Sequence, residues 1–323
     1  MVIQGLVSII TPCYNSGAFI HRLLDSILMQ DYPSIEMFAI DDGSTDNTKE
    51  VIGSYIPKFQ KRGYKLTYLY QDNAGQAAAL NRGLKLVTGD FLTWPDSDDF
   101  YTKTDSISTF VSTLRDMDET YGAVCFIGTF VNENTLANLG WELEFNKSEN
   151  LFCSCLLGEA FLAIPINYMI RTSALDDVNP KRDIYTGRHP QNMQMFLPLF
   201  YSFKCRTIIE PQCNILVRSS SHSHTIKPYK QQLDDIEGYY EIKINTLDHM
   251  HKLTTEERRI WKKQSKIRAL QSKQALAIRF KKYQEAKSYT KSLKELGVST
   301  NIKTQIKILF LNFPLIHNFV SNV

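Results

Sequence analysis

Apolar and polar residues alternate between two patterns along roughly the first 100 positions. Short apolar runs, each typical of a buried parallel strand, cover residues 6–11, 37–40, 66–70 and 91–94. Between these runs, apolar residues recur at helical spacing over residues 19–28, 51–56 and 75–86. An alternation of strands and helices predicts an α/β fold with a mostly parallel central sheet and helices on both faces.

The rest of the chain follows a different pattern. Residues 123–217 are less regular, with strand-like stretches at 123–130 and 206–209. The last quarter is rich in Ala, Lys, Gln, Leu and Glu, which favour helices. Because the composition changes near residues 221–227, we predict an α/β domain over residues 1–225 and a helical C-terminal region over residues 226–323.

Composition narrows the class of protein. The sequence contains no run of about 18 apolar residues, so we expect no transmembrane helix. Its N-terminal apolar stretch lacks the basic start of a signal peptide. The six cysteines form no C-x-x-C pair, which favours free thiols in a reducing cytoplasm.

Charge is distributed unevenly along the chain. Residues 252–294 contain 14 Lys and Arg but only 3 Asp and Glu, whereas the remainder has 23 basic and 31 acidic residues. Such a basic tail suggests an anionic partner surface, and the lack of a nucleic-acid recognition motif favours a membrane over a nucleic acid. A solvated helical face, packing on the α/β domain and a homodimer are the alternatives. The apolar residues that could add membrane contact are Leu309, Phe310, Leu311, Phe313, Leu315, Ile316 and Phe319.

Three loops follow predicted strands and should share one edge of the sheet. They cover residues 11–15, 41–44 and 96–99, and ligands of parallel sheets bind beyond the carboxyl ends of the strands. The last loop carries Asp96, Asp98 and Asp99. Three adjacent carboxylates repel one another and favour a divalent cation such as Mg²⁺ or Mn²⁺, although an acidic turn that caps a helix is the simpler alternative.

Further polar groups at this edge suit a nucleotide. A carboxylate of Asp41 or Asp42 could accept from a ribose hydroxyl or a base N–H, and Gly43 permits a tight turn. Gly75 opens a helix, which allows close approach of a phosphate or ribose. Neither G-x-G-x-x-G after the first strand nor G-x-x-x-x-G-K-[ST] occurs, which argues against dinucleotide enzymes and P-loop nucleotidases.

Taken in order, these motifs resemble glycosyltransferase family 2, the inverting enzymes with a GT-A fold. The resemblance is carried by VSIITPCYNSGAFIHRLLDSILMQ, IDDGSTDNT and DNAGQAAALNRGLKLVTGDFLTWPDSDD. It is close over residues 6–105 and looser up to about residue 225. It implies transfer of one sugar from a nucleotide-diphosphate sugar, with UDP favoured, to a glycan or lipid-linked acceptor in bacterial surface polysaccharide synthesis.

The resemblance also implies roles for individual residues. Pro12, Tyr14 and Asp42 would contact the nucleobase and ribose, and Asp96 and Ser97 would lie beside the ribose and diphosphate. Asp98 would be the principal ligand of Mn²⁺ or Mg²⁺, with Asp96 close to the same cation. Inversion implies a single in-line displacement that needs a general base.

The sequence departs from the family at the position of that base. Gln191 and Asn192 occupy the positions of the family's acidic pair, and an amide cannot take a proton as a carboxylate does. Asp183, Glu159 and His189 are candidate substitutes, although each is also typical of a surface residue.

Two histidines provide a further candidate. His222 and His224 alternate in an extended segment that begins at Arg218, so either could lie near the diphosphate or the metal; a polar linker is the alternative. The competing functions are a nucleotidyltransferase, whose Gly-rich basic signature near the first strand is absent, and a non-catalytic nucleotide-sugar-binding protein. We expect a cytoplasmic enzyme at the inner face of the plasma membrane.

Overall fold

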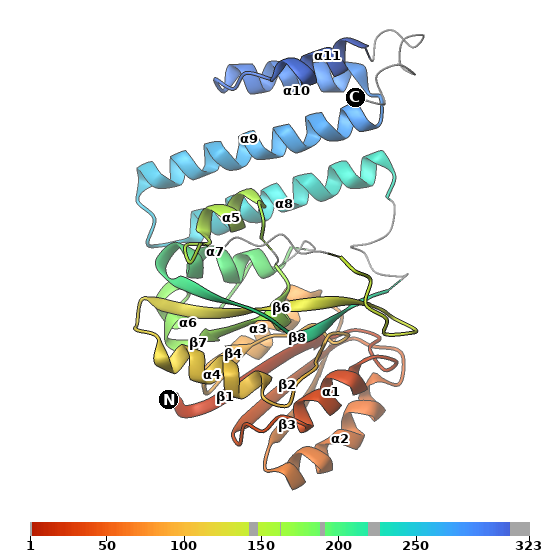
Figure 1. The fold of residues 1–323 in the computed structure, drawn as a ribbon, viewed down its shortest axis with the longest axis vertical. Coiled ribbons are helices and arrows are strands. Elements are labelled where there is room, and N and C mark those ends of the chain that lie inside the picture. The colour runs from red at the N-terminus through yellow and green to blue at the C-terminus, as the bar shows by residue number, and fades with distance from the viewer. Residues whose placement is uncertain (1, 142–147, 162, 188–190, 219–226, 311–323) are drawn as a thin grey trace. The chain divides into compact units, whose positions relative to one another are not determined.

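The computed structural model describes residues 2–141, 148–161, 163–187, 191–218 and 227–310. The chain divides into two compact units. The first contains Met1–Thr225 and Met250–Lys252, and the second contains Ile226–His249 and Leu253–Val323. The first unit is an α/β domain, and the second consists of helices (Figure 1).

A central sheet of eight strands organises the α/β unit (Figure 1). The strand order is β3-β2-β1-β4-β7-β6-β8-β5. The strands are β1 (Ile3–Cys13), β2 (Ile35–Asp42), β3 (Lys65–Gln71), β4 (Gly89–Thr93), β5 (Phe100–Tyr101), β6 (Tyr121–Asn132), β7 (Tyr168–Arg171) and β8 (Lys204–Val217). The four expected N-terminal strands are therefore confirmed, and the two expected in the middle of the chain extend further than the apolar runs indicated.

The sheet has two halves of different character. Strands β3, β2, β1 and β4 are all parallel, and their register brings Cys13 opposite Asp41 and Asp42 opposite Gln71, so the strand ends align. The short strand β7 then joins the halves by pairing antiparallel with both β4 and β6. Strands β6 and β8 are parallel to each other, and β5 pairs antiparallel with β8.

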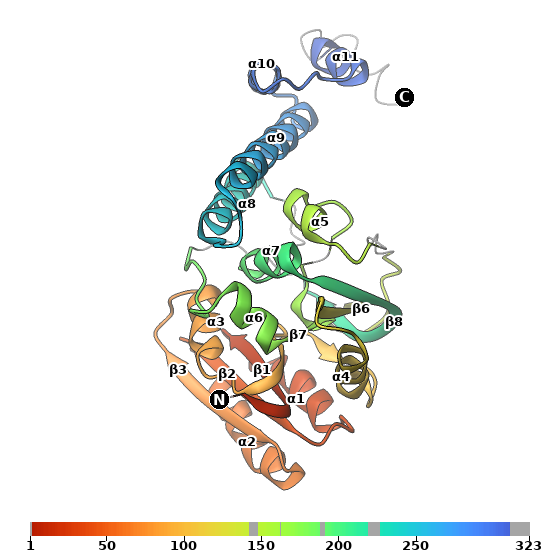
Figure 2. The same ribbon diagram turned by 90° about the vertical axis from the view of Figure 1, so that its left-hand side faces the viewer.

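Helices cover both faces of this sheet (Figure 2). The helices of the unit are α1 (Ile20–Leu28), α2 (Thr48–Arg62), α3 (Gln76–Leu84), α4 (Ser106–Asp116), α5 (Phe152–Leu157), α6 (Thr172–Val178) and α7 (Asn192–Ser202). Helices α1, α2 and α4 share one apolar core with the sheet, and the apolar spacing in α1 buries Leu23, Leu24 and Ile27 there. Helix α3 packs closely against β1. A Cβ atom on Gly83 would lie only 2.4 Å from Cγ2 of Ile10.

The second unit contains α8 (Tyr229–His249), α9 (Thr255–Arg279), α10 (Tyr283–Glu295) and α11 (Ile302–Phe310). Thr254 begins α9 with a capping box that includes Glu257. A small core around Ala277, Ala286 and Ile308 joins α9, α10 and α11. Within the described residues, no helix combines the length and the apolar character that a membrane crossing requires.

Candidate functional site

Loops from β1, β2 and β4 meet at the carboxyl edge of the sheet. The backbone N–H of Asn15 donates to Oγ of Ser44 at 2.9 Å, and the Ser16 and Ser97 hydroxyls lie 2.8 Å apart. Asn15 adopts a positive φ of 48°, and its side-chain oxygen accepts from the Thr45 N–H at 2.9 Å. The three loops that the sequence placed on one edge are therefore connected directly by hydrogen bonds.

The carboxylate of Asp42 holds the segment that leads into α3. Its two oxygens accept from Nε2 of Gln71 at 2.8 Å, from the Ala74 N–H at 2.9 Å and from the Gly75 N–H at 2.8 Å. Asp42 is 3% exposed, but a carboxylate offers about four acceptor positions. At neighbouring Gly43, φ is +82° and a Cβ would lie 2.8 Å from a backbone nitrogen, which explains the glycine.

Other predicted nucleotide residues lie at the ends of β1 and β2. The ring of Pro12 is buried at the end of β1, whereas Tyr14 is 56% exposed. Asp41 is buried and accepts from the Ser44 N–H at 2.9 Å and from the Tyr68 hydroxyl at 2.7 Å. Asp41 thus secures the turn itself, whereas the aromatic ring of Tyr14 is open to solvent at this edge.

Three carboxylates follow β4, each in a different environment. Oδ1 of Asp96 accepts from Nε2 of Gln76 at 2.6 Å, and Oδ1 of Asp99 accepts from the Leu216 N–H at 3.0 Å. Oδ2 of Asp98 lies 2.8 Å from Nε of Arg218, with 17% of the Asp98 side chain exposed. The guanidinium of Arg218 also lies over the ring of Phe19, 4.6 Å from its centroid.

The electrostatic environment raises the pKa of all three carboxyls. Loss of solvation, followed by the charge of Asp98, raises the pKa of Asp96 to about 7, although Asp96 keeps part of its surface open to solvent. Burial raises the pKa of Asp98 against the opposing effect of Arg218. Burial and the charges of Asp98 and Asp96 raise the pKa of Asp99 well above its usual value. Such mutual repulsion is what a bound cation relieves.

The residues present fit a divalent cation that is bound together with a phosphate. Asp96 and Asp98 would supply carboxylate oxygens, and Mg²⁺ commonly uses one or two carboxylates plus substrate phosphates and water. Within the described part of the chain, no group of three His, Cys, Asp or Glu side chains is arranged to hold a metal. His222 and His224 lie outside the described residues.

Asn192, at the position expected for a base, contacts Trp94 in the segment between β4 and the carboxylates. Its Oδ1 accepts from Nε1 of Trp94 at 3.2 Å, and its Nδ2 donates to the carbonyl of Ala163 at 3.0 Å. Gln191 precedes it and is 4% exposed. Asn192 therefore lies near the site, but both ends of its amide are engaged in supporting Trp94 and Ala163.

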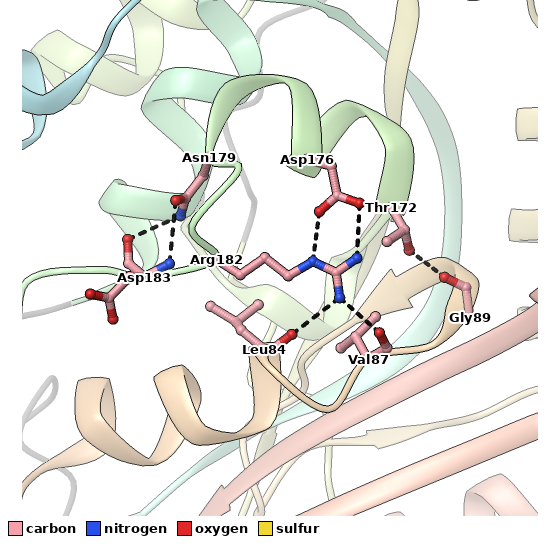
Figure 3. A network of polar contacts seen from close by, with 8 residues as sticks. All are labelled: Leu84, Val87, Gly89, Thr172, Asp176, Asn179, Arg182 and Asp183. Carbon is pink, nitrogen blue, oxygen red and sulfur yellow. Dashed lines mark hydrogen bonds and ion pairs between the residues drawn. The ribbon is translucent and has the colours of Figure 1, made fainter. Parts of the chain in front are cut away.

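The segment around Asp183 is fixed by a polar network (Figure 3). Arg182 forms two contacts with Asp176, at 2.6 and 2.8 Å, and donates to the Val87 carbonyl at 2.7 Å. The carboxylate of Asp183 lies 3.8 Å from Nζ of Lys85. Since Lys85 and Val87 lie between α3 and β4, this network is at the amino end of β4, opposite the carboxylates.

Glu159 and His189 are the other two candidate bases. Glu159 is exposed in the loop after α5, and His189 lies outside the described residues. Sequence reasoning did not assign roles to Gln76, Trp94 or Arg218. Only Arg218 carried a signal, because it begins the polar segment that includes the two histidines.

The sheet order, the helices on both faces and the acidic edge define an α/β domain of the GT-A type. The chain matches the model of the family described as "Glycosyl transferase family 2" over residues 8–178. That match covers more than half of the chain, so the protein belongs to this family. The prediction from sequence of the family and of its fold is confirmed.

Relatives and solved structures agree with this assignment. The chain is 30% identical to glycosyltransferase GlyA of Streptococcus pneumoniae over 161 residues, and 34% identical to an uncharacterized glycosyltransferase of Rickettsia prowazekii over 152 residues. These alignments cover 50% and 47% of this chain, but only 20% and 41% of those relatives. The chain therefore matches less than half the length of either protein.

Two solved structures share the fold at low sequence identity. S. aureus TarS 1-349 in complex with UDP-GlcNAc superposes with a TM-score of 0.63 at 16% identity, covering 95% of this chain and 87% of that one. Mannosyltransferase PcManGT from Pyrobaculum calidifontis, in complex with GDP-Man and Mn²⁺, gives a TM-score of 0.59 at 16% identity, covering 97% and 81%.

Proposed function

We propose that the protein transfers a sugar from a nucleotide-diphosphate sugar, with UDP favoured, to a glycan or lipid-linked acceptor in surface polysaccharide synthesis. The observation that carries this proposal is the carboxyl edge of the sheet, where buried Asp42 and the acidic run Asp96–Asp99 lie on connected loops. Membership of the family supports the reaction class.

Each part of the donor has a proposed place on this edge. Tyr14 and Pro12 form a wall for the nucleobase, and Asp42 accepts from the base or ribose with its remaining lone pairs. Gly75 and Ser97 lie along the path to the diphosphate, since Gly75 bonds to Asp42 and Ser97 to Ser16. Asp98 and Asp96 hold Mn²⁺ or Mg²⁺, which stabilises the negative charge that develops on the leaving nucleoside diphosphate.

Inversion requires that the acceptor hydroxyl attacks from the face opposite the leaving group and loses its proton. Asn192 cannot accept that proton, and we assign it the support of Trp94, with Gln191 buried beside it. Glu159 and His189 are the preferred proposals for the base. Asp183 is the weaker proposal because its side chain is at the opposite end of β4 from Asp98.

Donor turnover distinguishes this proposal from its two rivals. Purified protein with UDP-sugar and Mn²⁺ should release UDP, slowly to water or faster to an acceptor. A nucleotidyltransferase would instead release or consume pyrophosphate. A non-catalytic binding protein would release neither UDP nor pyrophosphate.

Replacing Asp98 tests the site itself. In Asp98→Ala, Mn²⁺ should no longer raise the activity, and kcat/KM should fall by on the order of 10³-fold. This loss corresponds to a metal effect of several kcal/mol. Asp116→Ala, an exposed aspartate on α4, is the matched control and should behave as wild type. An unchanged affinity for UDP and an unchanged metal requirement in Asp98→Ala would refute the proposal.

Membrane attachment through the helical unit is a separate part of the proposal. In α11, Ile302, Ile306 and Leu309 are 74%, 43% and 58% exposed and share one side of the helix by their spacing. Lys303 and Lys307 are also exposed, whereas Ile308 packs on the unit's small core. An apolar stripe flanked by lysines fits the boundary of an anionic membrane.

Liposome co-sedimentation tests this attachment. The full chain should pellet with anionic vesicles, less at high salt, and little with neutral vesicles. Ile302→Asp with Ile306→Asp should reduce pelleting, whereas Ile260→Asp on α9, where the side chain is 41% exposed against 43% for Ile306, should reduce it less. Equal pelleting of all variants would contradict a role for α11, and a concentration-dependent dimer would favour a second copy as the partner.

A further inference from the structure

The carboxylate assigned to the cation already has a positive partner within the chain. Nε of Arg218 lies 2.8 Å from Oδ2 of Asp98, and the two side chains are only 28% and 17% exposed. The ring of Phe19 supports the guanidinium from one side at 4.6 Å. Because both charges are largely removed from water, this pair is screened less than an ion pair on the open surface.

The backbone beside Arg218 is tied to the same acidic loop. Arg218 follows β8 directly, and the N–H of Leu216, two residues earlier, donates to Asp99 at 3.0 Å. The base of the arginine side chain is therefore held next to the carboxylates. If the guanidinium leaves Asp98, it does so by side-chain rotation and stays within reach of ligands on this edge.

A guanidinium and a divalent cation compete for one carboxylate. Two positive groups on Asp98 would repel each other, so a cation that binds alone must first displace Arg218. A nucleoside diphosphate changes this balance, because its oxygens match the planar fork of N–H donors on arginine. Arg218 can therefore bind the diphosphate in place of Asp98, which leaves the Asp98 carboxylate available to the cation.

We propose that Arg218 makes cation and diphosphate binding interdependent: it occupies Asp98 in the free protein and transfers to the diphosphate when the donor binds. This inference rests on the proposed function, since it takes Asp98 as the cation ligand. Its consequence is that the free protein binds Mn²⁺ weakly and the nucleotide complex binds it tightly. By linkage, Mn²⁺ strengthens UDP binding by the same factor.

The coupling factor is measured without any turnover. Titrations followed by electron paramagnetic resonance give the Kd of Mn²⁺ with and without saturating UDP, and calorimetry gives the Kd of UDP. In Arg218→Gln, Mn²⁺ alone should bind about tenfold more tightly, and UDP with Mn²⁺ more weakly. The ratio of the two Mn²⁺ constants should fall at least about fivefold, within the usual range of coupling between sites.

A matched control lies on β8, the strand that Arg218 follows. Arg206 of β8 pairs with Glu149 at 3.1 Å, away from the acidic loop, so Arg206→Gln should leave the coupling factor as in wild type. Thermal melting establishes that each variant is folded. If Arg218→Gln fails to fold, Arg218→Lys replaces it and should give a smaller decrease of the same sign, since its point charge lacks the planar fork.

Two outcomes would overturn the inference. If Arg218→Gln weakens UDP but leaves the Kd of Mn²⁺ alone unchanged, Arg218 is only a diphosphate ligand. If Mn²⁺ alone binds more weakly in Arg218→Gln, the arginine supports the cation rather than competing with it. Failure of the proposed function looks different, because then Asp98→Ala would bind Mn²⁺ and UDP as wild type does.

Discussion

Asp42 ends β2 and Asp98 lies in the loop after β4, both in the parallel half of the sheet, yet they obtain their partners from different parts of the chain. Asp42 is held by Gln71, Ala74 and Gly75, about 30 residues away and all within the first half. Asp98 pairs with Arg218, 120 residues away, at the end of β8. The end of the site that we propose for the nucleoside is thus held by residues nearby in sequence, whereas the end proposed for the metal also depends on the chain after β8.

This difference predicts how each end of the site should respond to a ligand or to a substitution. Local hydrogen bonds around Asp42 form whenever the parallel strands form, so that end should be rigid without a ligand. The pair between Asp98 and Arg218 connects the acidic loop to the end of β8. A ligand that binds either side chain should therefore change this part of the site. Three substitutions test the comparison.

Of these three substitutions, the one at Asp42 should have the largest effect. Asp42→Ala should weaken UMP binding by about 1.5–3 kcal/mol, the range for hydrogen bonds to charged groups, and should also lower the free energy of unfolding by about 1–3 kcal/mol because the Ala74 and Gly75 N–H groups lose their acceptor. Calorimetry with UMP and urea unfolding measure the two quantities. Asp42→Asn, which retains an acceptor oxygen, should lose less of each. A loss confined to UDP, with UMP unaffected, would show that Asp42 does not serve the nucleoside.

A smaller effect is expected at Asn192, which joins α7 to Trp94 after β4 by a hydrogen bond. Asn192→Leu removes the acceptor of the Trp94 indole and should lower the free energy of unfolding by about 1–3 kcal/mol, the cost of leaving a buried donor unsatisfied. Asn192→Asp keeps an acceptor for Trp94 but places a carboxylate against the Ala163 carbonyl, so turnover should fall or stay level. A clear gain in kcat for Asn192→Asp would contradict the supporting role and point to a base at this position.

The smallest effect is expected at Asp183. Its pair with Lys85 is 3.8 Å long with both side chains more than half exposed, so Asp183→Ala should change stability by about 0–1 kcal/mol and leave kcat unchanged. Asp176→Ala is the contrasting variant, because Asp176 binds Arg182 through two contacts and its loss should cost more. A decrease of roughly 10²–10⁴ in the rate of Asp183→Ala, with donor binding intact, would identify it as the general base after all.

The same contrast explains what the sequence could predict. Strands β1 to β4 each contain a short, mainly apolar run with polar residues after it, so their order, their helices and the acidic edge follow from local patterns. Strand β7 has four residues, Tyr168–Arg171, and exists because β4 and β6 pair with it, which no local pattern reveals. The contacts of Asp98 with Arg218 and of Trp94 with Asn192 join residues about 100 positions apart, so they required the structure.

A substitution at Gly83 should disturb the carboxyl edge of the sheet, although Gly83 itself lies away from that edge. A methyl group at this position would lie 2.4 Å from Ile10, so Gly83→Ala would force α3 outward from β1. The first residue of α3 is Gln76, which holds Asp96, and it lies about 10 Å along the same rigid rod, at 1.5 Å per residue. One extra carbon atom near the end of α3 would therefore displace Gln76 and, with it, the Asp96 carboxylate that we propose lies beside the diphosphate, so Gly83→Ala should lower turnover without contacting the substrate.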